Sequence, residues 1–314
     1  MSEKNSALSH TLKSVGDTAQ KAADQTKILV HKGKIKSEKA QESIINAIDQ
    51  NGNGEVDVED IIVLGLRVPG IRIKRAPFLE AELKKRYPKD IIVDAVEHNP
   101  KHAKIPLDVI DEIANDVIQY ERNCVSGISA VLGAPGGAAM VATIPADIAQ
   151  YYGYLLRATQ KLMYLYGFPE IDFTEKEQKF DSETMNLLIL CLGVMYGAAG
   201  ANNALKSMAK ALGTGIEKQL LNKALTKGTI YPIVKSVAKY FNVKMSKEIF
   251  AGFFKKAIPV VGGVIGGGIT YLSFKPCCDR LKDSLRDTML SNPHYNPLLE
   301  DDDHIVFDID AEKT

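Results

Sequence analysis

Three long runs without a charged residue constrain the fold of this chain more than any other feature. They cover residues 124–146, 184–205 and 257–274. Strand-type alternation of apolar and polar residues is scarce, whereas apolar spacings of three and four residues recur along the chain. We therefore predict an all-α fold, a multi-helix bundle with glycine-rich helices at its centre.

The same runs are compatible with two environments, a lipid bilayer and the core of a packed helical bundle. At 18 to 23 residues they reach the length of a transmembrane helix. G-x-x-x-G spacings, which favour close helix contact in a bilayer, occur at Gly193/Gly197, Gly262/Gly266 and Gly263/Gly267. However, glycine costs about 1 kcal/mol per helical position relative to alanine, and Ala, Thr and Asn dilute the apolar character. The sequence therefore favours buried core helices over membrane insertion.

The strongest local motif is a twelve-residue segment at residues 49–60, between two apolar helical patterns. It resembles an EF-hand calcium loop, which places oxygen ligands at positions 1, 3, 5, 7, 9 and 12 and a glycine at position 6. The matching residues are Asp49, Asn51, Asn53, the Glu55 carbonyl, Asp57 and Asp60, with Gly54 at the turn and apolar Val56 at position 8. We expect Ile61 to start the exiting helix.

One position departs from the EF-hand pattern, since Asp60 stands where glutamate is usual. The shorter side chain makes two-oxygen contact with a large cation harder, which lowers the expected calcium affinity or shifts preference toward magnesium. The alternative is a solvated Asn-Gly turn, which uses the same residue types. The number of matching positions favours a Ca²⁺ or Mg²⁺ site.

A helix with one polar face is expected after the first charge-free run. Pro145 suits its first turn and Gly167 its C-terminal cap. Its polar face comprises Asp147, Gln150, Tyr154, Arg157 and Lys161. This face is either a binding groove or a solvated helix side, and the second interpretation is the more common one for charged stripes.

The distribution of charges and the spacing of the cysteines limit which partners and which location the protein can have. Net charge is zero, but residues 206–256 carry eleven lysines, two acids and no arginine. Without arginine, bidentate contacts to phosphates and bases are missing, so we expect no nucleic-acid partner. Basic amphipathic helices suit an anionic membrane surface, with a solvated face as the alternative. Four cysteines without a C-x-x-C pair indicate a reducing, intracellular setting.

No catalytic motif is present. His98 and His102 have the spacing of metal ligands on one helix face, but Pro100 between them makes that helix doubtful. An unrecognised hydrolase using Asp147 and Arg157 stays as an alternative. The sequence favours a protein that is not an enzyme.

The chain resembles the EcsC protein family over about residues 115–290. The resemblance rests on the glycine-rich run followed by Asp147-Ile148, on Arg157 with Gln160, on Tyr166-Gly167-Phe168, and on the later Ile-Pro-Val-Val-Gly-Gly element at residues 258–263. It implies a helical, membrane-associated domain and no particular reaction. The loop at 49–60 lies outside the region of resemblance.

We therefore expect four regions: an amphipathic or flexible arm (1–36), an EF-hand-like helical region (37–118), an EcsC-like helical domain (119–290) and an acidic flexible tail (291–314). The expected function is non-catalytic: a Ca²⁺- or Mg²⁺-binding loop that modulates the conformation, or the binding to a membrane or protein partner. The expected location is cytoplasmic, at or in the inner face of a membrane. A soluble scaffold with buried glycine-rich helices is the alternative.

Overall fold

The computed structural model describes residues 42–43, 45–132, 139–173, 175–176, 179–180, 182–214, 230–245 and 262–295. This part of the chain is a bundle of α-helices, which confirms the all-α prediction. A short antiparallel pair, β1 (Glu175–Lys176) and β2 (Lys179–Phe180), is the exception. The predicted arm and nearly all of the predicted tail lie outside the described residues.

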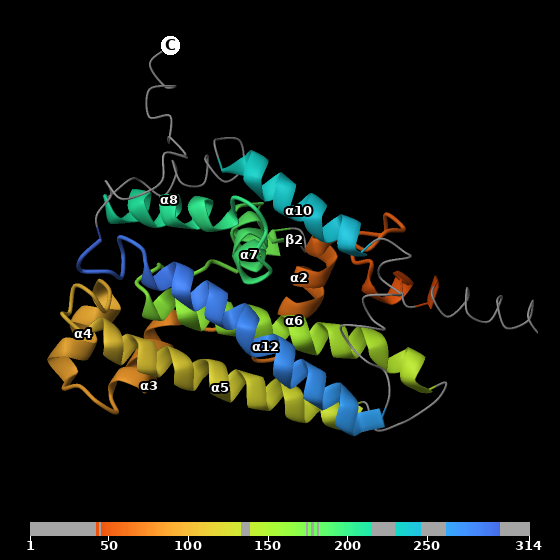
Figure 1. The fold of residues 1–314 in the computed structure, drawn as a ribbon, viewed down its shortest axis with the longest axis horizontal. Coiled ribbons are helices and arrows are strands. Elements are labelled where there is room, and N and C mark those ends of the chain that lie inside the picture. Colours follow the sequence, from red (N-terminus) through yellow and green to blue (C-terminus); the bar gives the residue numbers. More distant parts are fainter. Residues whose placement is uncertain are drawn as a thin grey trace, which may run out of the picture.

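Three long helices, α5 (Leu107–Leu132), α6 (Ala139–Leu165) and α12 (Gly262–Arg286), lie side by side, with α6 and α12 antiparallel to α5 (Figure 1). The shorter helices surround them. They are α2 (Val58–Leu66), α3 (Arg75–Leu83), α4 (Lys89–Glu97), α7 (Ser182–Met195), α8 (Ala201–Gly213) and α10 (Tyr231–Met245). Prolines at 88 and 106 directly precede α4 and α5, as their punctuating positions predict.

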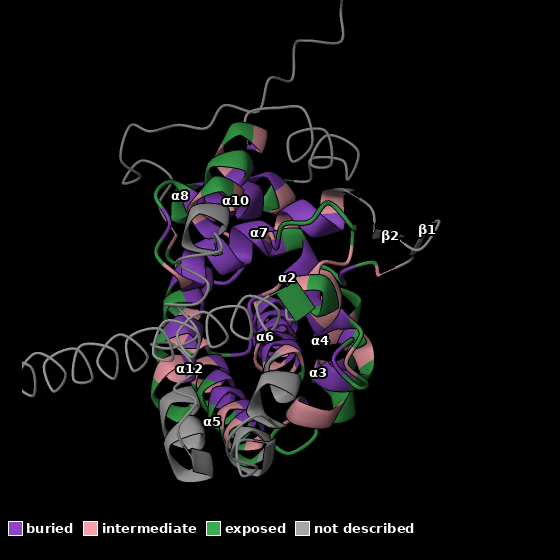
Figure 2. Ribbon diagram, turned by 90° about the vertical axis from the view of Figure 1, so that its right-hand side faces the viewer, coloured by how far each residue is buried: buried purple, intermediate pink, exposed green. Residues whose placement is uncertain are grey.

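Helix α6 is the central element of the bundle. It packs against α2, α3, α5 and α12, and its described side chains are mostly buried (Figure 2). One contiguous hydrophobic core joins residues from Ile48 to Leu290. Helix α5 runs through the expected boundary at 118/119, and α2 is packed into the bundle against α6 and α7. The helix after the 49–60 loop therefore shares its core with the glycine-rich helices.

The charge-free runs are not three uninterrupted helices. The first contains the end of α5 and the start of α6. The second is divided between α7 and α8 by a turn in which Gly197 and Gly200 have φ of 70° and 78°, values that only glycine adopts freely. In the third, α12 begins at Gly262 and continues past the run into charged residues. Among the described residues, every helix is too short or too polar to cross a membrane.

Only one glycine of the Gly193/Gly197 pair makes the close helix contact expected of it. A Cβ atom at Gly193 would lie 2.8 Å from a methyl carbon of Val237 on α10, so the glycine permits this approach. Gly197 instead belongs to the turn that ends α7. The close contact at Gly193 therefore joins two helices of the bundle, α7 and α10.

The two ends of α6 test the capping predictions differently. Gly167 has φ of 91°, and the Phe168 N–H donates to the Met163 carbonyl at 2.9 Å, so the predicted glycine cap is confirmed. The prediction for Pro145 is wrong, because α6 begins at Ala139 and the proline lies inside the helix. Good helix formers before the proline allow the earlier start, although proline offers no N–H to the carbonyl four residues back.

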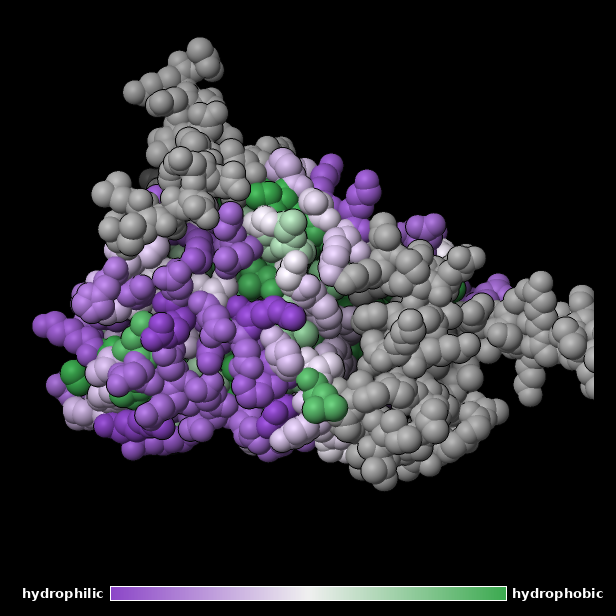
Figure 3. Space-filling view, in the orientation of Figure 1, coloured by the Kyte–Doolittle hydropathy of each residue, from purple (hydrophilic) through white to green (hydrophobic). Residues whose placement is uncertain are grey.

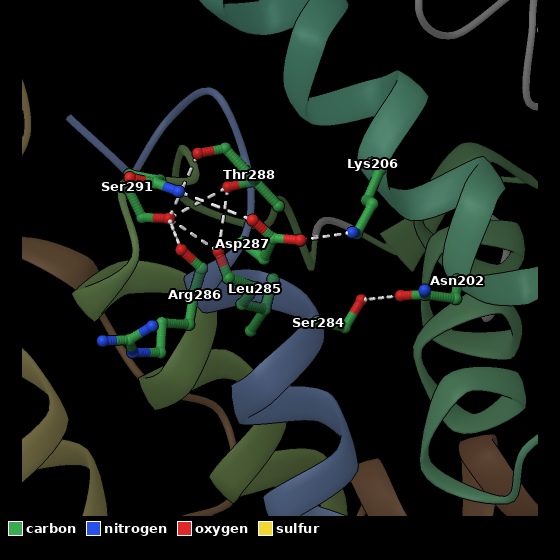
Figure 4. Close-up of polar contacts among 9 residues, drawn as sticks. Asn202, Lys206, Ser284, Leu285, Arg286, Asp287, Thr288 and Ser291 are labelled. Atoms are coloured by element: carbon green, nitrogen blue, oxygen red, sulfur yellow. Dashed lines mark hydrogen bonds and ion pairs between the residues drawn. The ribbon is translucent and has the colours of Figure 1, made fainter. Parts of the chain in front are cut away.

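The C-terminal end of α12 is fixed to α8 by polar contacts (Figure 4). The Ser284 hydroxyl bonds to Asn202, and Lys206 Nζ lies 2.6 Å from Asp287 Oδ2. The chain then turns, and the buried Ser291 hydroxyl donates back toward the carbonyl oxygens at the end of α12, among them Leu285 O at 2.7 Å. The turn after α12 is therefore a firmly held part of the molecule.

Candidate functional site

The 49–60 loop connects a helical segment ending at Ile48 with α2. Asp57 is the N-cap of α2 and forms a reciprocal capping box with Asp60: each backbone N–H donates to the other's carboxylate at 3.0 Å. Helix α2 therefore begins at Val58, three residues before the expected start at Ile61, because the capping box already satisfies the first free amides. Val56, the apolar residue at position 8, is buried.

Asp49 organises the first half of the loop. Its Oδ1 accepts the Gly52 N–H at 2.7 Å, and its Oδ2 accepts the Gly54 N–H at 2.7 Å. Gly52 and Gly54 have φ of 72° and 82°, so both positions favour glycine. Positions 1 and 6 of the loop thus form the sharp turn that the EF-hand pattern predicts.

The middle of the loop is exposed and held by side-chain to backbone hydrogen bonds. Asn51 Oδ1 accepts the Asn53 N–H at 3.0 Å, and Asn53 Oδ1 accepts the Glu55 N–H at 2.8 Å. The Asn51 amide also donates to Asp57 at 3.4 Å. A cation loop and a plain Asn-Gly turn would both contain such bonds, so they leave the two interpretations open.

Asp60 is the most buried of the six proposed ligands, with 1% of the residue exposed. Its Oδ1 accepts the backbone N–H groups of Gln50 at 2.9 Å and Asn51 at 3.2 Å, while Oδ2 accepts that of Asp57. Burial, together with the nearby carboxylates of Asp57 and Asp49, raises the pKa of Asp60 to about 6. A cation at position 12 would have to share these oxygens with backbone amides.

The C-terminal half of the predicted polar face of α6 packs against α5. Glu121 of α5 is completely buried, and its Oε1 lies 2.5 Å from Lys161 Nζ and 3.3 Å from Arg157 Nε. Lys161 is itself 8% exposed. Glu121 is absent from the predicted polar cluster, although an acid following Val117 by four residues on the apolar stripe of α5 is a recognisable signal.

The N-terminal half of the same face is half-buried and lacks such a partner. Asp147 Oδ1 and Gln150 Oε1 are buried atoms without a hydrogen-bond partner among the described residues. Burial raises the pKa of Asp147 to about 6, and it also raises the pKa of Tyr154. At 1.5 Å per residue, Asp147 and Arg157 are about 15 Å apart along α6, so this helix does not bring them together as a catalytic pair.

Comparison with known proteins provides no independent assignment. No protein-family model, no curated protein and no solved structure matches this chain. The resemblance to the EcsC family stays a prediction from the sequence. The function is therefore inferred from the chemistry of the residues themselves.

Proposed function

We propose that this chain is a non-catalytic, divalent-cation-binding helical protein whose 49–60 loop controls how α2 sits on the bundle. The observation that carries the proposal is the burial of Asp60 at the junction of the loop and α2. Three backbone N–H groups donate to this carboxylate, those of Gln50, Asn51 and Asp57, yet its pKa is still raised to about 6, so these bonds do not fully offset the cost of burial. A cation in the loop supplies the remaining compensation.

The donor atoms of the loop suit a hard cation. The proposed ligands are carboxylate, amide and carbonyl oxygens, which Ca²⁺ and Mg²⁺ prefer, and they come from Asp49, Asn51, Asn53, the Glu55 carbonyl, Asp57 and Asp60. The ion would compete for Asp60 Oδ1 with the amides of Gln50 and Asn51. Ion binding and loop closure are therefore linked through one side chain.

A shift of Asp60 would act directly on residues of the hydrophobic core, because the residues that follow it in the chain belong to that core. Ile61 and Ile62, which follow it on α2, are fully buried. Further along, Gly65 of α2 contacts Gly153 of α6 so closely that a Cβ at Gly65 would lie 2.9 Å from the Gly153 nitrogen. Because this contact has no free space, a shift of α2 must be transmitted to α6.

Calorimetric titration of the full-length chain with Ca²⁺, and separately with Mg²⁺, tests the cation site. We expect one site in the unmodified protein and at least about tenfold weaker binding in Asp49→Ala, because the variant loses the ligand at position 1. The melting temperature should rise with the ion, since a ligand at 100 times its dissociation constant adds about 2.7 kcal/mol. Asp116→Ala, which removes an exposed carboxylate on α5, is the matched control.

Three results would count against the cation site. They are a titration without heat for either ion, a melting temperature indifferent to both ions, and equal binding by Asp49→Ala and the unmodified protein. Affinity should also fall as pH drops below about 6, because protonation of Asp60 removes the charge that the ion needs.

The proposed partner of the ion-bound state is an anionic membrane surface. Supporting it, Lys235 and Lys239 are exposed on α10 while Val234, Val237 and Phe241 of the same helix are buried, so the outer face is basic. Each lysine near an anionic bilayer contributes about 1 kcal/mol. The resemblance to the EcsC family points the same way.

Flotation with phosphatidylserine vesicles, with and without Ca²⁺, tests the membrane partner. We expect Lys235→Glu/Lys239→Glu to reduce the bound fraction by at least about tenfold, since two attractive charges become repulsive. The control is Lys84→Glu/Lys89→Glu, which makes the same charge change on exposed residues near α3 and α4. If the protein never floats with the vesicles, the result favours the scaffold alternative and does not count against the cation site.

A further inference from the structure

A second group of ligating side chains lies where α4 ends. Asp94 is in the last turn of α4, His98 follows the helix directly, and His102 lies in the turn that leads to α5. Pro100 does prevent a helix between the two histidines, as the sequence suggests. The turn nevertheless stacks the two imidazole rings, with centroids 4.1 Å apart and an angle of 20° between the planes.

Both histidines direct the same nitrogen to the same oxygen. His98 Nδ1 lies 3.0 Å and His102 Nδ1 lies 2.8 Å from Asp94 Oδ1. Within the described ranges, this is the group of at least three His, Cys, Asp or Glu residues whose ligand atoms all lie within 4.8 Å of one another. We propose that Asp94, His98 and His102 form a binding site for a transition-metal ion of the zinc class.

The two nitrogen–oxygen separations are close to those of tetrahedral coordination. Zinc bonds to histidine nitrogen and carboxylate oxygen are about 2.0–2.2 Å long, which places neighbouring ligand atoms about 3.3 Å apart. The nitrogen–oxygen separations of 2.8 and 3.0 Å need to widen by only a few tenths of an ångström, and the stacked rings need to turn so that both Nδ1 lone pairs point at one ion. With three protein ligands, the ion keeps at least one position for water or for a partner's side chain.

The group is open to solvent. The side chains of His98 and His102 are 53% and 56% exposed, and that of Asp94 is 34% exposed. Hydrophilic residues predominate on the described surface at the α4 end of the molecule (Figure 3). An ion can therefore reach the site from solvent without any opening of the fold.

The buried side chain of Arg75 holds the C-terminal end of α4 in place. Arg75, the first residue of α3, donates from its guanidinium to the carbonyl oxygens of Val96 at 2.6 Å, Ala95 at 3.3 Å and His98 at 2.8 Å. The last of these bonds holds the backbone of a proposed ligand. The backbone of His98 is therefore held without a metal ion.

Hydrogen bonds also hold the backbone around His102. The backbone N–H of His102 donates to Asn99 Oδ1 at 2.8 Å. Lys101, beside His102, donates from Nζ to the carbonyl oxygens of Met289 at 2.7 Å and Asn292 at 2.9 Å, in the turn after α12. Since the polar contacts shown in Figure 4 hold that turn, the backbone that carries His102 is positioned before an ion arrives.

The donor set distinguishes this site from the 49–60 loop. Two imidazole nitrogens suit Zn²⁺, Cu²⁺ or Ni²⁺, whereas Ca²⁺ and Mg²⁺ prefer oxygen. The alternative is a pair of aspartate–histidine hydrogen bonds that stabilises the turn. The inference does not rest on the proposed function, and the two sites can be tested in one protein with different ions.

Calorimetric titration of the full chain with zinc tests the site. We expect one zinc ion per chain, with binding at least about tenfold weaker in His98→Ala, His102→Ala and Asp94→Asn, because each variant loses one of three ligands. His294→Ala, which removes an exposed histidine outside the group, should bind zinc as the unmodified protein does. Circular dichroism of each variant without metal shows whether the fold is retained.

Spectroscopy with Cu²⁺ separates a metal ligand from a residue that only stabilises the turn. We expect electron paramagnetic resonance to show two coordinating nitrogens in the unmodified protein and one in His102→Ala. Failure of the unmodified protein to bind zinc would overturn the proposal, as would zinc binding that survives both histidine substitutions. Asp49→Ala should leave the zinc affinity unchanged, so failure at one site does not imply failure at the other.

Discussion

Two acidic side chains, one on α5 and one on α6, are fully or partly buried beside very different neighbours. Glu121 is fully buried and has Lys161 and Arg157 beside it. Asp147 is half-buried, and its Oδ1 has no hydrogen-bond partner in the described part of the chain. The first carboxylate is balanced by opposite charge. The second is not, and burial raises its pKa to about 6.

Substitution of Asp147 should therefore stabilise the protein at neutral pH. The raised folded-state pKa of Asp147 makes the folded protein hold a proton that the unfolded chain releases, so the cost grows as pH rises from about 4 to about 6 and is fully present above that range. We expect Asp147→Asn to raise the free energy of unfolding by at most about 2–3 kcal/mol at neutral pH. Urea unfolding across this pH range measures the difference.

The exposed Asp116→Asn substitution on α5 is the control for this prediction. Its side chain is 78% exposed, so its effect should be small and nearly independent of pH. A difference between Asp147→Asn and the unmodified protein that stays constant from neutral to acid pH would contradict the argument from burial.

At the level of elements, the contact between α2 and α6 depends on two glycines. A Cβ at Gly153 would lie 3.0 Å from the Gly65 carbonyl oxygen, and one at Gly65 would meet the backbone of Gly153. The two helix backbones are therefore in direct contact. Neither helix can accept a side chain here without moving.

Gly65→Ala should destabilise the protein by about 1–3 kcal/mol, because the added methyl group meets backbone that cannot rotate away. The matched control is Gly127→Ala in α5, where a Cβ has nothing within 4 Å. That substitution should stabilise by about 0.5–1 kcal/mol through helix propensity alone. Thermal unfolding of both variants measures the contrast, and equal effects would disprove the close contact.

The helices differ in how well local signals predict them. Prolines before α4 and α5 mark their starts, and Gly167 marks the end of α6, since each signal acts on the backbone next to it. The start of α6 is predicted wrongly because Pro145 is compatible with a first turn but does not require one. The division of the second charge-free run depends on the conformation of Gly197 and Gly200, which the sequence leaves open.

On the scale of the whole molecule, Arg75 connects parts that are far apart in the chain. Its guanidinium reaches the end of α4 and also donates from Nε to the Phe168 carbonyl at 3.2 Å, just after α6. Its backbone N–H donates to Glu170 at 3.0 Å. Burial lowers the pKa of Arg75, but its hydrogen bonds keep the charged group satisfied.

Arg75→Lys should cost about 2–4 kcal/mol of stability despite the retained charge, because an ammonium group cannot reproduce four bonds in the fork geometry of arginine. Arg86→Lys is the matched control: Arg86 pairs with exposed Glu112 at 2.9 Å, and surface pairs are worth about 0–1 kcal/mol. Urea unfolding compares the variants. Full stability of Arg75→Lys would show that the bonds to distant carbonyls contribute nothing.

The sequence by itself determined the helical class of the protein and the turns of the 49–60 loop, because helical periodicity, glycine conformation and Asx turns act within a few residues. Only the tertiary structure decided that Glu121 meets Lys161 in the core and that His98 and His102 converge on one oxygen. Those pairings depend on how separate helices and turns pack. A polar pattern read along one helix does not say whether water or another helix covers it.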